Sequence, residues 1–172
     1  MDVKELSSKY QVRKLIAQDV DLIYELSIGN PMFYEYCPPY VTKEGITDDM
    51  SALPPGKSLD DKFYIGYFSN NELMAIMDLI FSYPNKNTAW IGLFMMNQKY
   101  QGKGYGSKII EECVIHLKHL GFESIQLAFA KGNFQSEAFG RKMALIKRET
   151  SPKTRSIRLL LCREYYKSVF SN

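Results

Sequence analysis

Apolar residues recur along the chain with two different periods, and each period predicts one kind of element. Alternation with a period of two, or a run rich in aromatic and β-branched residues, predicts strands at residues 10–16, 62–68, 72–83, 88–96, 124–130, 145–150 and 156–164. Spacings of three and four predict helices at residues 20–28, 42–52, 109–120 and 134–143. The resulting order, in which helices interrupt two groups of strands, predicts one mixed α/β domain over residues 1–172.

Two connections between these elements carry their own signals. Residues 69–71, Ser-Asn-Asn, suit a hairpin turn, so the strands from residue 62 to residue 96 are expected to form an antiparallel meander. Residues 30–40, NPMFYEYCPPY, are rich in proline and aromatic residues and are expected to form a loop rather than a helix or strand.

The composition is that of an ordinary globular domain. The chain has 172 residues, 45% of them hydrophobic and 24% charged, which is enough to bury a core without disulfides or metals. No run approaches the roughly 18 apolar residues of a membrane span, and the N-terminus lacks the apolar stretch of a secretory signal. The 3 cysteines are odd in number and widely spaced, so a cytoplasmic location is expected. With 2 histidines the chain offers few metal ligands, and no metal site is expected.

Charge is distributed unevenly along the chain. Residues 1–60 hold 6 basic and 10 acidic side chains, whereas residues 141–172 hold 9 basic and 2 acidic side chains. A nucleic-acid-binding domain should not have an acidic first third, so nucleic acid is not an expected partner. The split suits a cationic ligand near the N-terminal segments and an anionic one near the C-terminal segments. An unevenly charged, solvated surface accounts for it equally well.

The sequence QGKGYG at residues 101–106 directly precedes a predicted helix. Glycine costs about 0.5–1 kcal/mol relative to alanine in regular structure, so its repeated use needs an explanation. A glycine-rich loop at a helix N-terminus presents bare N–H groups at the positive end of the helix dipole, which favours phosphate. The spacing fits neither the G-x-x-x-x-G-K-[ST] loop nor the G-x-G-x-x-G loop. A flexible turn without a ligand is the alternative.

This loop resembles the Q/R-x-x-G-x-G/A motif of the GNAT superfamily of N-acetyltransferases. Two further stretches resemble the family in the same order: the strand WIGLFMM before the loop, and KGNFQSEAFGRKMAL after it, with Asn133, Ser136, Phe139 and Lys142 at the family's offsets. The resemblance covers about residues 10–165. It implies a GNAT fold, a single domain with a mixed, mostly antiparallel sheet flanked by about four helices.

The resemblance also implies a site for acetyl-CoA. In similar proteins the strand before the loop pairs with the pantetheine arm, and the loop holds the pyrophosphate. The implied coenzyme-A-binding residues are Phe94, Met95, Met96, Gln101, Gly102, Lys103, Gly104, Tyr105, Gly106, Ser107, Asn133 and Phe139. Judged on their spacing alone, Phe94, Met96 and Phe139 are as readily explained as core residues, and Asn133 as a helix cap.

The implied activity is direct transfer of an acetyl group from acetyl-CoA to an amine. An alkyl amine with a pKa of about 10.4 is mostly protonated at pH 7, so a base must first remove a proton. Asp78 is the candidate base because it interrupts an apolar strand, where a carboxylate is costly unless it is paired or used. A structural aspartate is the alternative, and Glu72 is the weaker candidate. A backbone N–H near Met95 or Met96 would stabilise the oxyanion, which makes Met96 the second catalytic candidate.

The chain departs from the family at the general acid. Many relatives have a tyrosine seven residues after the matched asparagine, where this chain has Gly140. Tyr105, a tyrosine of residues 34–40 or water would have to protonate the coenzyme A thiolate instead. The departure also keeps a second function open, that of a catalytically weak sensor that binds acyl-CoA.

Acceptor recognition is expected in residues 30–40. Tyr34, Glu35 and Tyr36 would form an aromatic, mildly acidic wall for a cationic amine, or the aromatic residues simply cover the core beneath a long loop. The expected partner is a primary amine of a small molecule or peptide, with no membrane involved. The sequence leaves open the identity of the amine, the acyl chain length and the choice between a monomer and a homodimer.

Overall fold

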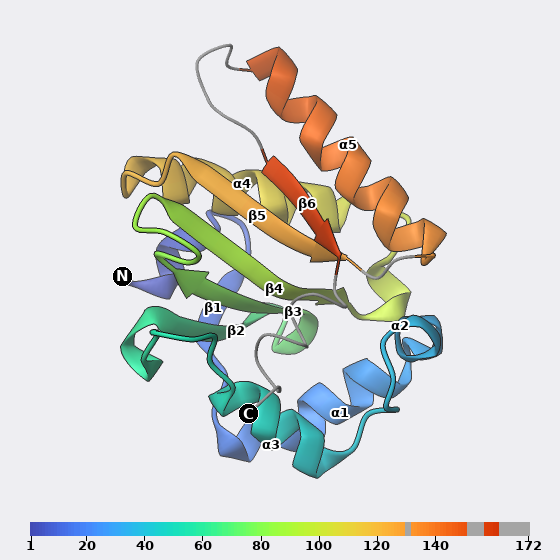
Figure 1. The fold of residues 1–172 in the computed structure, drawn as a ribbon. Helices are drawn as coiled ribbons and strands as arrows, with labels where there is room; N and C mark the ends of the chain where they lie inside the picture. The colour runs from blue at the N-terminus through green and yellow to red at the C-terminus, as the bar shows by residue number, and fades with distance from the viewer. Residues whose placement is uncertain (130–131, 151–156, 162–172) are drawn as a thin grey trace.

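A single six-stranded sheet organises the protein in the computed structural model, which describes residues 1–129, 132–150 and 157–161 (Figure 1). The strands lie side by side in chain order: β1 (Gln11–Lys14), β2 (Lys62–Ser69), β3 (Glu72–Phe81), β4 (Thr88–Met96), β5 (Ser124–Phe129) and β6 (Ile157–Leu161). Neighbours from β1 to β4 are antiparallel, whereas β4, β5 and β6 are parallel. The expected antiparallel meander from residue 62 to residue 96 is present.

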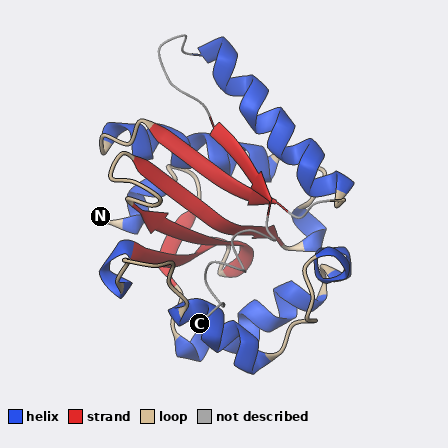
Figure 2. Cartoon of the chain, viewed as in Figure 1, coloured by secondary structure: helices blue, strands red, loops and turns tan. Residues whose placement is uncertain are grey.

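Helices cover both faces of this sheet (Figures 1 and 2). They are α1 (Val20–Ile28), α2 (Pro31–Tyr36), α3 (Lys43–Ser51), α4 (Tyr105–His119) and α5 (Phe134–Thr150), with short 3₁₀ helices η1 (Val3–Leu6), η2 (Ala17–Asp19), η3 (Leu59–Asp61) and η4 (Gln98–Tyr100). The elements η1 and α4 pack on one face, and α1 and α3 on the other. The predicted α/β fold with a mixed, mostly antiparallel sheet is confirmed.

No helix within the described residues is both long and apolar enough to cross a membrane.

The strand β3 is buried on both faces, which explains its nearly continuous run of apolar residues. Met77 and Leu79 belong to the cluster under α4, where Cys113 is also fully buried. Ile76 points to the opposite face and packs in the cluster that contains Ile23 of α1. Because each such side chain stabilises the fold by about 1.5–3 kcal/mol on burial, β3 holds the two helical layers together.

The prediction of a loop throughout residues 30–40 is wrong, because Pro31–Tyr36 form the helix α2. Pro31 occupies the first turn of the helix, where the missing N–H has no helical partner to lose and the fixed φ suits the helix. The Cys37 N–H donates to the Phe33 carbonyl oxygen at 2.9 Å and closes the last turn. Proline therefore marks the start of a helix at this position.

The prediction of a strand at residues 145–150 is also wrong, because α5 continues to Thr150. The segment contains good helix formers and no glycine or proline before Pro152, so nothing local ends the helix earlier. Of the expected final strand pair, residues 157–161 form β6. The remaining positions of that prediction, 156 and 162–164, lie outside the described residues.

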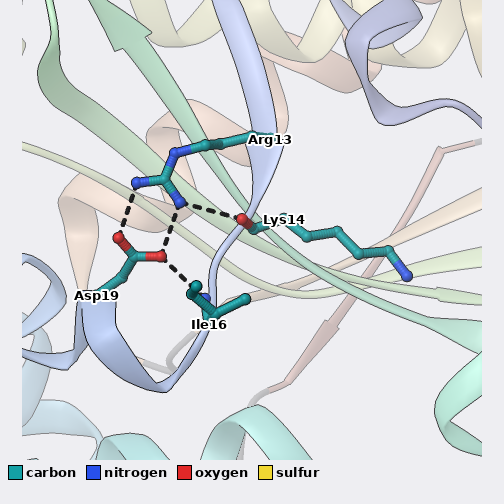
Figure 3. Close-up of polar contacts among 4 residues, drawn as sticks. All are labelled: Arg13, Lys14, Ile16 and Asp19. Carbon is teal, nitrogen blue, oxygen red and sulfur yellow. Dashed lines mark hydrogen bonds and ion pairs between the residues drawn. The ribbon is translucent and has the colours of Figure 1, made fainter.

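A bidentate ion pair holds the turn from β1 into α1 (Figure 3). Arg13 donates to both carboxylate oxygens of Asp19 at 2.7 Å each, and its Nη1 also donates to the Lys14 carbonyl oxygen at 3.1 Å. Asp19 Oδ2 accepts the Ile16 N–H at 2.9 Å. The hydrogen bonds from Arg13 hold the pKa of Asp19 below its usual value, against the effect of burial. The charged carboxylate thereby fixes the place where the chain turns towards α1.

A second ion pair is buried between β2 and β3. Lys62 Nζ lies 2.8 Å from each carboxylate oxygen of Asp78, and the two residues are only 4% and 5% exposed. Tyr64 stands opposite Asp78 in the register of the two strands. A carboxylate this deep in the sheet is tolerated because the ammonium compensates for the lost hydration.

Replacing Lys62 tests this compensation. Lys62→Met keeps most of the side-chain volume but leaves Asp78 without the ammonium, so we expect the free energy of unfolding to fall by about 3–5 kcal/mol. Lys62→Met combined with Asp78→Leu leaves no buried charge and is expected to recover most of that loss. Urea unfolding at pH 7 measures both variants.

Lys57→Met is the matched control. Lys57 Nζ lies 3.1 Å from Asp61 in a more exposed pair, so its loss should cost less than about 1 kcal/mol. Equal losses for the Lys57 and Lys62 variants would contradict a special role for the buried pair.

Candidate active site

The sheet opens between β4 and β5. The two strands pair in parallel from Thr88↔Ser124 to Ile91↔Leu127. Directly after this stretch the register of β4 with β3 shifts by one residue, which makes Gly92 the extra residue of a bulge. Among the described residues, positions 93–96 of β4 pair with β3 but not with β5. One backbone edge of β4 is therefore open over these positions.

Two residues turn their backbone groups towards this opening. The Asn97 N–H donates to the Met74 carbonyl oxygen at 2.8 Å, so these two residues form a hydrogen-bonded pair of the antiparallel ladder. Because such pairs alternate with pairs that are not bonded to each other, the backbone groups of Met95 face β3. Those of Phe94 and Met96 face the open edge.

The glycine loop follows directly and leads into α4. Gly102 and Gly104 have φ values of +72° and +81°, and Gly104 is the N-cap of the helix. A Cβ atom at either position would meet no atom within 4 Å, so the backbone conformation, rather than packing within the protein, calls for glycine. The N–H groups of the first turn of α4 lie at the positive end of the helix dipole, beside open space. The predicted geometry of an anion-binding loop is thus present.

Gly106 has a different role from the two glycines before it. A Cβ atom there would lie 3.4 Å from the Phe94 ring and 3.4 Å from Met96 Cγ, at the lower limit of ordinary van der Waals contact. The missing side chain lets the start of α4 approach the open end of β4. The glycine loop and the open edge are consequently parts of one site.

A cavity of about 440 Å³ lies at this junction. Residues from the α1–α2 connection, the end of β4, the glycine loop and the start of α5 line it: Gly29, Asn30, Pro31, Met32, Phe33, Phe94, Met95, Met96, Gln98, Tyr100, Gln101, Gly102, Gly104, Gly106, Ser107, Asn133, Gln135, Ser136, Phe139 and Lys142. Ten of the twelve residues expected to bind coenzyme A are among them. Lys103 and Tyr105 are not: Lys103 Nζ donates to the Lys99 carbonyl oxygen at 2.9 Å, and Tyr105 packs edge-on against Tyr100.

A network of side-chain amides crosses the cavity at the end of β4. Asn30 Nδ2 and Gln101 Nε2 both donate to the Met96 carbonyl oxygen, at 3.1 and 3.0 Å. Gln101 Nε2 also donates to Asn30 Oδ1 at 2.6 Å, and Gln135 Nε2 donates to Gln101 Oε1 at 3.1 Å. Sequence reasoning identified Gln101 but not Asn30 or Gln135, because only the fold brings residues so far apart in the chain together.

The start of α5 completes the cavity wall. Asn133 is 4% exposed and its Oδ1 accepts the Ser136 N–H at 3.1 Å, so it caps the helix as one of the two sequence interpretations expects. Phe139 stacks on Phe94, with ring centroids 5.8 Å apart. Gly140, the position where relatives carry tyrosine, is buried.

Hydroxyl groups are nevertheless present along the cavity. Ser107 and Ser136 line it, as does Tyr100. The Tyr100 hydroxyl donates to Glu72, the weaker of the two candidate bases, which also pairs with Lys99. Glu72 is thereby engaged at the start of β3.

The three residues expected to bind the acceptor all lie on α2, but they do not line the cavity. Tyr34 is half-buried against the cluster under α1 and α3, and Glu35 is exposed. Tyr36 is 41% exposed, and its ring lies 3.2 Å from where a Cβ atom of Gly132 would be. The cavity wall is formed by Pro31, Met32 and Phe33 instead.

Asp78, the predicted base, also lies outside the cavity lining. It stands opposite Leu93 in the register of β3 and β4, on the face of the sheet covered by α1 and α3, where Lys62 pairs with it. Asp49 of α3 belongs to the same charged group. Burial, followed by the charge of Asp78, raises the pKa of Asp49 to about 6, and Lys62 opposes the rise.

Within the described residues, no group of three or more His, Cys, Asp or Glu side chains could hold a metal ion.

Solved acetyltransferases share this fold. The PaiA N-acetyltransferase from Thermoplasma acidophilum, in complex with coenzyme A, is 18% identical with a TM-score of 0.58, covering 79% of this chain and 89% of that one. The ribosomal-protein-S18-alanine N-acetyltransferase from Escherichia coli is 13% identical with a TM-score of 0.56, covering 78% and 76%. An aminoglycoside acetyltransferase from an uncultured soil metagenomic sample, in complex with sisomicin, is 14% identical with a TM-score of 0.52, covering 78% and 86%.

The family assignment comes from a sequence model rather than from these distant structures. No match was found among curated proteins. The model described as Acetyltransferase (GNAT) family matches residues 29–144, a stretch that contains every residue lining the cavity. It spans more than half of the 172 residues, and the chain therefore belongs to the acetyltransferase (GNAT) family.

Proposed function

We propose that this acetyltransferase moves the acetyl group of acetyl-CoA onto a primary amine of a small molecule or peptide by direct attack. The observation that carries the proposal is the meeting of two features in one cavity: an open strand edge at Phe94 and Met96, and a glycine loop at the N-terminus of α4. The first suits an extended arm with amide groups, by strand addition. The second suits a pyrophosphate. Coenzyme A has both parts.

The residues divide between the two parts of the donor. The N–H groups at the start of α4, with Gly102 and Gly104, would receive the pyrophosphate, and Lys142 adds positive charge at the cavity wall. The Phe94 backbone would pair with the pantetheine arm, and the Met96 N–H would donate to the oxyanion of the tetrahedral intermediate. This N–H faces the open edge as part of a fixed strand, so it needs no reorganisation when the charge develops.

The proposed reaction needs a base for the amine and a proton donor for the thiolate. We assign the base to Asp78, acting through water, with Asp49 and Lys62 tuning the charge around it. The coenzyme A thiolate is a tolerable leaving group: with a thiol pKa of about 8.5, it can leave without being protonated by a dedicated acid. Of the hydroxyls in the cavity lining, Ser136 donates to the Asn133 carbonyl oxygen at 3.0 Å and Tyr100 to Glu72. We therefore assign protonation of the thiolate to Ser107, in place of the tyrosine missing at Gly140.

The acceptor is proposed to enter beside α2. Met32 and Phe33 form an apolar wall on the cavity, with Tyr34, Glu35 and Tyr36 behind and beside them. The acidic first sixty residues favour a cationic amine over nucleic acid. Proteins of the same fold are described as acting on aminoglycosides and on a ribosomal protein, so both a small molecule and a peptide stay in the proposal. The widely spaced cysteines support a cytoplasmic location.

A sensor that binds acyl-CoA without rapid turnover is the second candidate, favoured by the buried Gly140 at the expected tyrosine position. The two candidates are separated by mixing the protein with acetyl-CoA and a panel of polyamines, aminoglycosides, amino acids and peptides while following release of free thiol. Thiol release with at least one amine is the expected result. Coenzyme A binding by calorimetry without turnover on any amine would favour the sensor, and a folded protein that binds no coenzyme A would contradict both functions.

Gly104→Val tests the pyrophosphate loop. A β-branched side chain is strained at φ +81° and would project into the space where the phosphates are proposed to lie. We expect the Kd for coenzyme A, measured by calorimetry, to rise at least about tenfold, since helix-terminus and bare-backbone contacts to phosphate are lost.

Gly56→Val is the matched control for this loop. Gly56 has a φ of +76° and equally open surroundings, but it does not line the cavity. Both variants should lose a similar amount of thermal stability, and only Gly104→Val should lose coenzyme A. A similar rise in Kd for the two variants would show that backbone strain, rather than the phosphate site, is responsible.

Asp78→Asn tests the base. Removing a general base should lower kcat/KM by roughly 10²–10⁴ over pH 6–9, with unchanged binding of coenzyme A. Because the substitution also leaves the buried Lys62 ammonium without its carboxylate, urea unfolding checks that the variant is folded under the assay conditions. Asp49→Asn separates the neighbouring carboxylate: because the pKa of Asp49 is about 6, that variant should alter only the part of the profile near pH 6. An Asp78→Asn enzyme with unchanged kcat/KM over this range would remove Asp78 from the mechanism.

A further inference from the structure

Asn30 lies where three parts of the site meet: the end of α1, the start of α2 and the end of β4. Its Nδ2 donates to the Leu26 carbonyl oxygen at 2.9 Å and to the Met96 carbonyl oxygen at 3.1 Å, and its Oδ1 accepts from Gln101 at 2.6 Å. Its backbone carbonyl accepts the Phe33 N–H at 3.0 Å. One residue is thus hydrogen-bonded to both helices, to the open strand and to the glycine loop.

The amides of Asn30 and Gln101 together saturate the Met96 carbonyl group. A carbonyl oxygen has two lone pairs, and here each of them has an amide donor, at 3.1 and 3.0 Å. Both N–H groups of each side-chain amide are also in use. The Met96 carbonyl therefore has no remaining capacity to accept a hydrogen bond from a ligand.

This saturation determines where an extended ligand can pair with β4. The backbone groups that face the opening are those of Phe94 and Met96. Because the Met96 carbonyl oxygen is occupied, the Phe94 carbonyl oxygen is the remaining acceptor on the open edge at positions 93–96. The Met96 N–H is left as a donor. A ligand amide N–H must pair at Phe94, which keeps the Met96 N–H for a group further along the ligand.

The same contacts tie the acceptor wall to the donor site. Asn30 is the N-cap position of α2, yet its side chain makes no capping hydrogen bond to that helix. The amide is instead used on Leu26, Met96 and Gln101. Because α2 begins at the next residue and presents Met32 and Phe33 to the cavity, its position depends on the end of β4 through Asn30.

We propose that Asn30 is a positioning residue that couples coenzyme A binding to the placement of α2, the acceptor wall. A ligand held at Phe94 and the glycine loop stabilises the arrangement in which Asn30 and Gln101 meet on Met96, and that arrangement places α2. By linkage, an acceptor that binds against α2 strengthens donor binding by the same factor. This proposal rests on the proposed use of coenzyme A at the site.

The test uses coenzyme A as the probe and the full chain. Calorimetry gives its Kd, and hydrogen exchange followed by mass spectrometry reports residues 29–37 and residues 101–108 with and without it. In the wild-type protein both segments should be protected on binding. In Asn30→Ala the loop should still be protected, residues 29–37 should not, and the Kd should rise about tenfold, which is within the range typical of coupling between two sites.

Gln101→Ala tests the same contact from the other side. It removes the second amide donor to the Met96 carbonyl oxygen and the amide oxygen that accepts from Gln135 Nε2. It should also abolish protection of residues 29–37. The Kd of the double variant for coenzyme A should be about the same as that of either single variant. Gln18→Ala, an exposed amide of η2, should behave as the wild type.

Protection of residues 29–37 that persists unchanged in both single variants would overturn the coupling, even if the Kd rises. A wild-type protein that protects the loop but not residues 29–37 would overturn it as well, while leaving the proposed function intact. A folded wild-type protein that binds no coenzyme A would contradict the proposed function itself and the coupling with it. Loss of protection confined to Asn30→Ala and Gln101→Ala supports the proposal.

Discussion

Beyond Ile91, β4 remains paired with β3, but among the described residues it no longer pairs with β5. The backbone N–H and C=O groups on this unpaired edge need other hydrogen-bond partners. The bulge at Gly92 makes the separation possible by re-aiming the strand at the point where pairing ends. The Met96 carbonyl finds side-chain amides. The remaining groups face the cavity. The unpaired edge of β4 therefore lines the cavity, and the rest of the cavity wall is arranged around it.

The helix dipole acts at the same place because the chain between β4 and α4 is short and unusually bare. Gly102 and Gly104 adopt left-handed conformations that allow the tight turn, and Gly106 lets the helix start lie against Phe94 and Met96. The helix N-terminus and the open strand edge therefore line the same cavity. Neither feature alone is specific to this family: helix N-termini and open edges occur in many folds, and their distance from each other gives the site its character.

On the face of the sheet covered by α1 and α3, two ion pairs act together with the apolar cluster. The Arg13–Asp19 pair fixes the entry to α1, and the Lys62–Asp78 pair lies in the sheet beneath α3. Both carboxylates are almost fully buried, so each must keep its cationic partner. The short helix α2 has no buried residue of its own and depends on neighbouring contacts for its position.

The sequence by itself determined the antiparallel meander of residues 62–96, the glycine loop, a helix cap as one of two interpretations of Asn133, and the family, because these depend on local periodicity, φ requirements and closely spaced residues. It did not determine that Pro31 starts a helix, that residues 145–150 extend α5, or that Asp78 pairs with Lys62, since each depends on what lies across the sheet or next along the helix. The cavity wall at Met32 and Phe33 and the amides on Met96 were decided only by the tertiary structure. Asn30 and Gln101 are separated by 71 residues in the sequence. No local sequence pattern can predict their contact, because it depends on the separation of β4 from β5 in the folded sheet.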